Sequence, residues 1–127
     1  MARVLVVDDE AQLALAVQIR LEAAGHQVTL AANGQDALQQ SAAQRPDIIL
    51  LDVMMPIMDG YSCLRELNRR DGKQRPPVIM LTARDQMQDL FRLEGMSDYV
   101  VKPFDHQDLL LRISRLLAHR SDRADAS

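Results

Sequence analysis

Residues 48–60, Ile48-Ile49-Leu50-Leu51-Asp52-Val53-Met54-Met55-Pro56-Ile57-Met58-Asp59-Gly60, decide the fold of this 127-residue chain. Four consecutive apolar residues, two of them β-branched, predict a strand buried on both faces, as in the middle of a parallel sheet. This strand ends in a carboxylate, Asp52, and then in a loop that contains proline and glycine. Because ligands bind at the carboxyl ends of strands in open parallel α/β sheets, we expect Asp52 to be functional. The alternative role of capping the next helix suits Asp59-Gly60 better.

The alternation of a short apolar run with a helical pattern recurs on both sides of this stretch. Residues between the runs place apolar side chains at helical spacing, most clearly in the last helix, 109–117. Five strands that alternate with five helices predict a parallel sheet with helices on both faces, a three-layer α/β sandwich. Right-handed crossovers then bring the carboxyl ends of all the strands to one edge. The other predicted strands are 3–7, 27–31, 78–81 and 99–101.

Composition limits the class of protein. Apolar residues make up 47% of the chain, so it should fold, and its length suits one domain, which we place at 1–118. Residues 119–127 are polar and aperiodic, and predict a tail or the start of a linker. A net charge of −3 argues against nucleic-acid contact by this domain. A single cysteine, Cys63, and the lack of any signal or membrane-spanning segment predict a cytoplasmic location away from membranes.

Polar residues follow four of the predicted strands and should meet at one edge of the sheet. They are Asp8 and Asp9, Asp52, Thr82 and Lys102. Three crowded carboxylates repel one another, and Mg²⁺ is the natural counter-charge for oxygen ligands. The Thr82 hydroxyl and the Lys102 ammonium suit the oxygens of a phosphoryl group, which makes Asp52 the nucleophile that forms an aspartyl phosphate. Taken singly, each residue has an ordinary structural role; Asp8 and Asp9, for example, suit the N-terminus of a helix, where acidic side chains favour the helix dipole.

These motifs together resemble the receiver domain of bacterial two-component response regulators. The resemblance covers about Arg3 to Leu117. It is carried by VLVVDDE at 4–10, LDVMMP at 51–56 with Asp59-Gly60, LTA at 81–83 and YVVKPF at 99–104.

The resemblance implies a flavodoxin-like (βα)5 fold with strand order 2-1-3-4-5. It implies that Asp9, Asp52 and the backbone carbonyl of Met54 ligate Mg²⁺, with Asp8 helping through water, and that Lys102-Pro103 is a cis peptide. The implied partner is a sensor histidine kinase or a histidine phosphotransfer protein, whose phosphohistidine donates to Asp52. Such a domain catalyses its own phosphorylation and dephosphorylation only, and is not a turnover enzyme.

Phosphorylation of Asp52 is expected to work as a switch. Added charge and acceptor oxygens would draw the Thr82 hydroxyl inward, and Tyr99 would follow into the vacated space. The readout would be the face formed by the fourth helix, the fifth strand and the last helix. On that face Asp98, Asp108, Arg112 and Arg115 alternate in charge beside Val100 and Leu111, which predicts a phosphorylation-dependent homodimer.

The segment between Thr82 and Lys102 departs from the family pattern. It is a couple of residues shorter than in most relatives, and Glu94-Gly95-Met96-Ser97 replaces the usual longer run. The site residues are untouched, but we expect the output face to be reshaped.

Three other functions fit parts of the pattern. A phosphatase of the haloacid-dehalogenase type needs a second aspartate two residues after the first, and Met54 stands there. A nucleotide-binding module needs a glycine-rich phosphate loop, which the chain lacks. A degenerate receiver that acts only as a protein-binding module remains the alternative.

Overall fold

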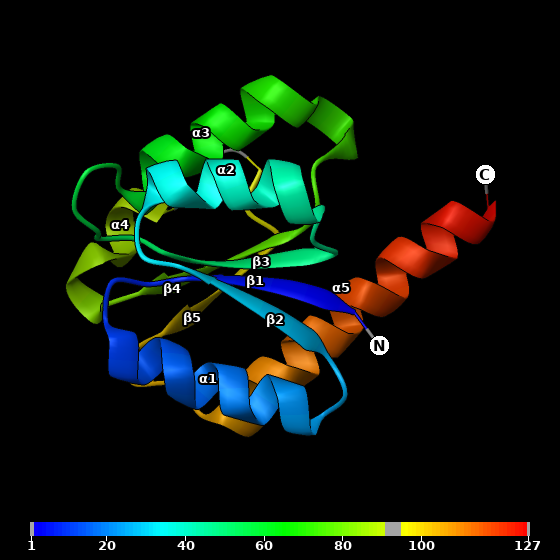
Figure 1. Ribbon diagram of the computed structural model, residues 1–127, viewed down its shortest axis with the longest axis horizontal. Coiled ribbons are helices and arrows are strands. Elements are labelled where there is room, and N and C mark those ends of the chain that lie inside the picture. The colour runs from blue at the N-terminus through cyan, green and yellow to red at the C-terminus, as the bar shows by residue number, and fades with distance from the viewer. Residues whose placement is uncertain (1, 91–94, 127) are drawn as a thin grey trace.

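The computed structural model describes residues 2–90 and 95–126 and contains one five-stranded parallel sheet (Figure 1). Its spatial order is β2-β1-β3-β4-β5, which confirms the order expected from the resemblance. The predicted strand bounds are matched to within one residue. The strands are β1 (Arg3–Val7), β2 (Gln27–Ala31), β3 (Ile48–Asp52), β4 (Val78–Thr82) and β5 (Asp98–Val101).

Helices cover both faces of the sheet. In Figure 1, α1 and α5 lie on one side, and α2 and α3 lie on the other. Two short 3₁₀ turns, Gly72–Gln74 and Arg84–Gln86, precede β4 and α4. The helices are α1 (Ala11–Ala23), α2 (Gly34–Gln44), α3 (Gly60–Asp71), α4 (Met87–Leu90) and α5 (His106–Ala126).

The central strand β3 is fully buried because both of its faces carry a core. Ile49 and Leu51 point into the cluster under α2 and α3, whereas Ile48 and Leu50 point into the cluster under α1 and α5. All four side chains are 0% exposed. Burying each such side chain stabilises the fold by about 1.5–3 kcal/mol, so this strand fixes the three-layer architecture.

Local capping residues set where the helices begin and end. Asp59 caps α3 by accepting a hydrogen bond from the backbone N–H of Ser62 at 2.8 Å, as the sequence predicts. Asn33 caps α2 through the N–H of Asp36 at 2.8 Å. Because Asp59 provides the cap of α3, the Asp52 carboxylate is free for another role.

The C-terminal helix is longer than its apolar pattern. The sequence predicts a polar tail after Ala118, but the backbone of α5 stays helical to Ala126 and runs beyond the sheet in Figure 1. The Arg120 guanidinium donates to the main-chain carbonyl of Asp47 at 2.8 Å, which ties this part of the helix to the start of β3. The domain boundary near residue 118 stays a prediction.

The shortened segment includes α4, of which Met87–Leu90 is described. Two residues of the shortened segment, Phe91 and Glu94, lie outside the described residues. On the far side, Gly95 has a φ of +95°, and its carbonyl accepts a hydrogen bond from the Arg75 guanidinium. Across residues 2–90 and 95–126, no helix has the length and apolar character needed to cross a membrane.

Candidate functional site

Strand register brings three of the predicted site residues into one row. Val6 pairs with Leu50, so Asp8 and Asp52 come two residues later on neighbouring strands and on the same side of the sheet. Leu81 connects them to β5, because it pairs with Asp52 on one side and with Val100 on the other. Lys102, two residues after Val100, therefore belongs to the same row.

The Lys102 ammonium lies between two buried carboxylates. Its Nζ is 2.9 Å from Asp8 Oδ2 and 3.0 Å from Asp52 Oδ1, while the exposed Glu10 carboxylate is 3.8 Å away. The other oxygen of Asp8 accepts a hydrogen bond from the backbone N–H of Glu10 at 2.9 Å. The predicted lysine thus bridges the two acids directly, and the Lys102-Pro103 peptide is cis as expected.

A third carboxylate completes an acidic cluster. Asp8, Asp9 and Asp52 each offer an oxygen, and these atoms all lie within 4.8 Å of one another. Asp9 is exposed, whereas Asp8 and Asp52 are buried. Three carboxylates and one ammonium leave a net charge of −2, and hard oxygen donors are what Mg²⁺ prefers. The donor set therefore fits a divalent cation.

Burial raises the pKa of Asp52 from 3.8 to about 6. The hydrogen bond from Lys102 opposes this rise, and the Asp8 charge adds to it. For Lys102, burial lowers the pKa, but hydrogen bonds to Asp8 and Asp52 outweigh burial and raise it overall. Lys102 is therefore a stable cation, and Asp52 is ionised above about pH 6.

The loop after Asp52 requires glycine at its end. A Cβ on Gly60 would lie 2.2 Å from the main-chain oxygen of Asp52 and 3.0 Å from Val53 Cα. The Gly60 N–H donates to the Val53 carbonyl at 2.8 Å, which closes the loop. Because these contacts are all with backbone atoms, no side chain can move aside to make room.

Thr82 and Tyr99 share one face of the sheet. Thr82 pairs with Val101 and Met80 pairs with Tyr99, so the two side chains are diagonal neighbours on the α2 and α3 side. Thr82 is fully buried, and its hydroxyl donates to the Ala83 carbonyl at 3.0 Å. An inward turn of this hydroxyl has to break that hydrogen bond.

The loop after Thr82 has a support that sequence analysis missed. The Tyr61 hydroxyl on α3 donates to the Gln86 main-chain carbonyl at 3.2 Å, and the Gln86 side chain accepts from the Ala83 N–H at 3.2 Å. These contacts join α3 to the segment that is expected to move. Only the packing of α3 against this loop reveals them, since no local motif marks Tyr61.

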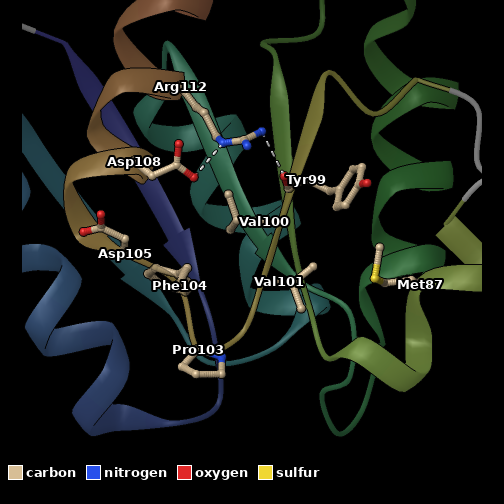
Figure 2. A pocket seen from close by; sticks show the side chains of 9 residues that line it. All are labelled: Met87, Tyr99, Val100, Val101, Pro103, Phe104, Asp105, Asp108 and Arg112. Atoms are coloured by element: carbon tan, nitrogen blue, oxygen red, sulfur yellow. Dashed lines mark hydrogen bonds and ion pairs between the residues drawn. The ribbon is translucent and has the colours of Figure 1, made fainter.

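Two of the predicted dimer residues, Asp108 and Arg112, line a pocket of about 440 Å³ beside β5 and α5 (Figure 2). Arg112 bridges Asp98 at 2.8 Å and Asp108 at 2.9 Å, and Arg115 is exposed on the same helix. In Figure 2 the Tyr99 ring points from β5 toward Met87 of α4, on the side away from Asp108.

The predicted apolar part of that face needs one correction. Leu111 is 51% exposed, as the prediction requires, but Val100 is only 4% exposed. Val100 is buried because it alternates with Tyr99 and points into the core under α1 and α5. It therefore belongs to the core and not to the exposed face.

Comparison with known proteins places the chain among signalling domains. Residues 4–114 match the family described as "Response regulator receiver domain". The chain is 38% identical over 125 residues to the "DNA-binding dual master transcriptional regulator RpaA" of Synechocystis, covering 97% of this chain and 52% of that protein. It is 37% identical over 120 residues to "Protein PilH" of Pseudomonas aeruginosa, covering 93% of this chain and 99% of that protein. The chain thus spans about half the length of RpaA.

A solved structure of a receiver domain has a similar fold. The receiver domain of sensor histidine kinase PA1611 from Pseudomonas aeruginosa has a TM-score of 0.84 and 32% identity, over 92% of this chain and 98% of that one. It is described "with magnesium ion coordinated in the active site cleft". The acidic cluster at the strand ends of the present chain agrees with such a cleft.

Proposed function

Because the chain belongs to the response regulator receiver domain family, we propose that it accepts a phosphoryl group from a phosphohistidine onto Asp52. Receiver domains are in general not turnover enzymes, and the catalysis proposed here is of the domain's own phosphorylation and dephosphorylation. The observation that carries the proposal is the bridging of Asp8 and Asp52 by Lys102 at 2.9 and 3.0 Å. Such a row places a nucleophile and a cation side by side.

The transfer is a displacement at phosphorus. An oxygen of the ionised Asp52 carboxylate attacks the phosphorus, a P–O bond forms, and the P–N bond to the donor imidazole breaks. The leaving imidazole nitrogen keeps the electron pair and takes up a proton. Lys102 shifts its ammonium from the Asp52 oxygen to an oxygen of the arriving phosphoryl group, so that one cation serves the site before and after transfer.

Mg²⁺, bound by Asp9, Asp52 and the Met54 carbonyl with Asp8 helping through water, would neutralise charge on the phosphoryl oxygens. The acidic cluster supports this ligand set, since a net charge of −2 remains after Lys102 is counted. Asp8 holds Lys102 in the row, which gives it a positioning role in addition to any contact with the metal.

The proposed switch runs from Thr82 to Tyr99. The phosphoryl oxygens offer the Thr82 hydroxyl a charged acceptor in place of the Ala83 carbonyl that it now contacts. Its movement opens space on the face that it shares with Tyr99, whose ring can then turn inward. The pocket between β5 and α5 changes shape as a result, because Tyr99 and Met87 line it.

We further propose that the face bearing Asp98, Asp108, Arg112 and Arg115 pairs two copies of the domain after phosphorylation. Exposed ion pairs contribute only about 0–1 kcal/mol each, so the charges set register, and Leu111 supplies the apolar contact. Sedimentation with and without beryllofluoride, a phosphoryl mimic, tests the pairing. A monomer in both conditions at high concentration would contradict it.

The proposed phosphorylation is tested with acetyl phosphate and Mg²⁺. The wild type should gain one phosphoryl group in a bond that survives acid and breaks in base, and Asp52→Asn should gain none. Stoichiometric labelling of Asp52→Asn would refute the assignment of Asp52. Absence of labelling in the wild type would favour a receiver that acts only as a protein-binding module.

A further inference from the structure

The turn between β4 and α4 is closed by two hydrogen bonds within itself. The Gln86 N–H donates to the Ala83 carbonyl at 3.0 Å, and the Ala83 N–H donates to the Gln86 side chain at 3.2 Å. Thr82 adds a third contact, because its hydroxyl donates to the same Ala83 carbonyl at 3.0 Å. Residues 83–86 therefore move as one unit, and a displacement of Thr82 displaces the whole turn.

The helix that faces this turn, α3, is fixed to the sheet. Cys63, Leu64 and Leu67 on this helix are at most 1% exposed and lie in the core under α2 and α3. The half-buried Tyr61 ring packs against the same core, so its hydroxyl is held in place. This hydroxyl donates to the Gln86 carbonyl at 3.2 Å, and the hydrogen bond joins the fixed helix to the turn.

The hydrogen bond from Tyr61 tolerates little movement of the turn. Hydroxyl donors usually lie about 2.5–3.0 Å from an oxygen acceptor, so a distance of 3.2 Å is already long. A shift of the Gln86 carbonyl by roughly half an ångström away from α3 breaks this hydrogen bond. The resting position of the turn is therefore the position that Tyr61 stabilises.

The turn connects directly to the face that is expected to carry the output. α4 begins at Met87, the residue after Gln86, and Leu90 at the end of α4 is 0% exposed in the core. Met87 and Tyr99 line the same pocket, and in Figure 2 the Tyr99 ring points toward Met87. A residue that holds Gln86 thus also sets where α4 begins relative to Tyr99.

We propose that Tyr61 is a positioning residue for the switch. Its hydrogen bond to Gln86 holds the turn in the resting position, and this hydrogen bond breaks when Thr82 moves toward a phosphoryl group on Asp52. This inference rests on the proposed function of Asp52 and Thr82. Because the hydrogen bond stabilises only the resting state, its removal should raise the fraction of domains in the switched state before any phosphoryl group arrives. A net hydrogen bond shifts an equilibrium roughly two- to tenfold, and the long distance here favours the lower half of that range.

The test is a titration with beryllofluoride in the presence of Mg²⁺, followed by NMR of the tyrosine rings. The chain has two tyrosines, so Tyr61→Phe removes one set of signals and leaves that of Tyr99 assigned. The variant loses the hydroxyl and keeps the ring that packs against the core. Arg69→Gln, at an exposed site on α3 where the arginine bonds to Glu66, is the control.

In the wild type the signals of both tyrosines should move as beryllofluoride binds, those of Tyr61 because its hydrogen bond to Gln86 breaks. In Tyr61→Phe, half of the Tyr99 change should be reached at a beryllofluoride concentration about two- to fivefold lower than in the wild type, because the binding-competent state is more populated. Arg69→Gln should match the wild type.

Two results would overturn the proposal. One is a half-saturating concentration in Tyr61→Phe that equals or exceeds that of the wild type, because a purely structural role lowers stability without favouring the switched state. The other is a Tyr61 signal that stays unmoved in the saturated wild type, a measurement that does not depend on the folding of the variant. An unmoved Tyr99 signal in the wild type would refute the switch, and the proposal with it. Failure of the wild type to gain a phosphoryl group from acetyl phosphate would instead refute the phosphorylation of Asp52.

Discussion

Replacing Asp52 with asparagine should stabilise the metal-free domain at neutral pH. Asparagine keeps the shape of the carboxyl group and an oxygen that can accept the hydrogen bond from Lys102, but it removes the buried charge. In EDTA no divalent cation compensates for this charge, and Asp8 remains close by. The variant therefore resembles the wild type with Asp52 permanently protonated.

The magnitude follows from the pKa of Asp52, which burial raises from 3.8 to about 6. The folded state then binds the Asp52 proton more tightly than the unfolded state does. The contribution of Asp52 to the stability of the wild type must fall as the pH rises through this window, by about 3 kcal/mol at about 1.4 kcal/mol per pKa unit. The Asp52→Asn variant lacks this loss, so its advantage should be about 3 kcal/mol at pH 7 and near zero below about pH 4.

Urea unfolding followed by circular dichroism measures this difference, since the chain has no tryptophan for fluorescence. Curves for both proteins in EDTA, between about pH 4 and pH 8, give the free energy of unfolding at each pH. Glu22→Gln, at an exposed site on α1, is the control and should shift stability by less than about 0.5 kcal/mol. A difference between Asp52→Asn and the wild type that is independent of pH would refute the reasoning, as would a less stable variant at pH 7.

Three further substitutions give distinct outcomes. Gly60→Ala should destabilise the fold by about 3 kcal/mol or more, because its Cβ would lie 2.2 Å from the Asp52 main-chain oxygen; a thermal melt within a degree or two of the wild type would contradict this. Asp9→Ala should weaken Mg²⁺ binding in calorimetry, and its melting temperature in EDTA should be no lower than that of the wild type because one repelling carboxylate is gone. A lower melting temperature in EDTA would count against repulsion among the three carboxylates. Thr82→Ala should still be phosphorylated on Asp52 yet leave the tyrosine NMR signals unmoved by beryllofluoride. Identical signals with and without beryllofluoride in the wild type would rule out the switch.

The sheet and the row of site residues were predictable because they depend on short-range patterns. Apolar runs bounded by turn residues define β1 and β3. Asp8 follows directly after β1, and Asp52 is the last residue of β3. Parallel topology then brings those ends together without any knowledge of packing. The sequence therefore predicted which residues come together at this edge of the sheet.

Contacts that depend on register or on packing between elements were not predictable. The bridging position of Lys102 requires the pairing of Leu81 with both Asp52 and Val100. The hydrogen bond from Tyr61 to Gln86 depends on how α3 packs against the loop after β4. The positive φ at Ile57 opposes the local backbone preference of a β-branched residue. The length of α5 was missed because its polar C-terminal sequence carries no apolar period.

Direct identification of the phosphorylated residue tests the central claim. Borohydride reduces an aspartyl phosphate to homoserine, which marks the modified position permanently for sequencing by mass spectrometry. After treatment with acetyl phosphate and Mg²⁺, homoserine should be found at position 52 and nowhere else. Homoserine at position 8 or 9, or phosphate recovered on a residue other than an aspartate, would contradict the role given to Asp52.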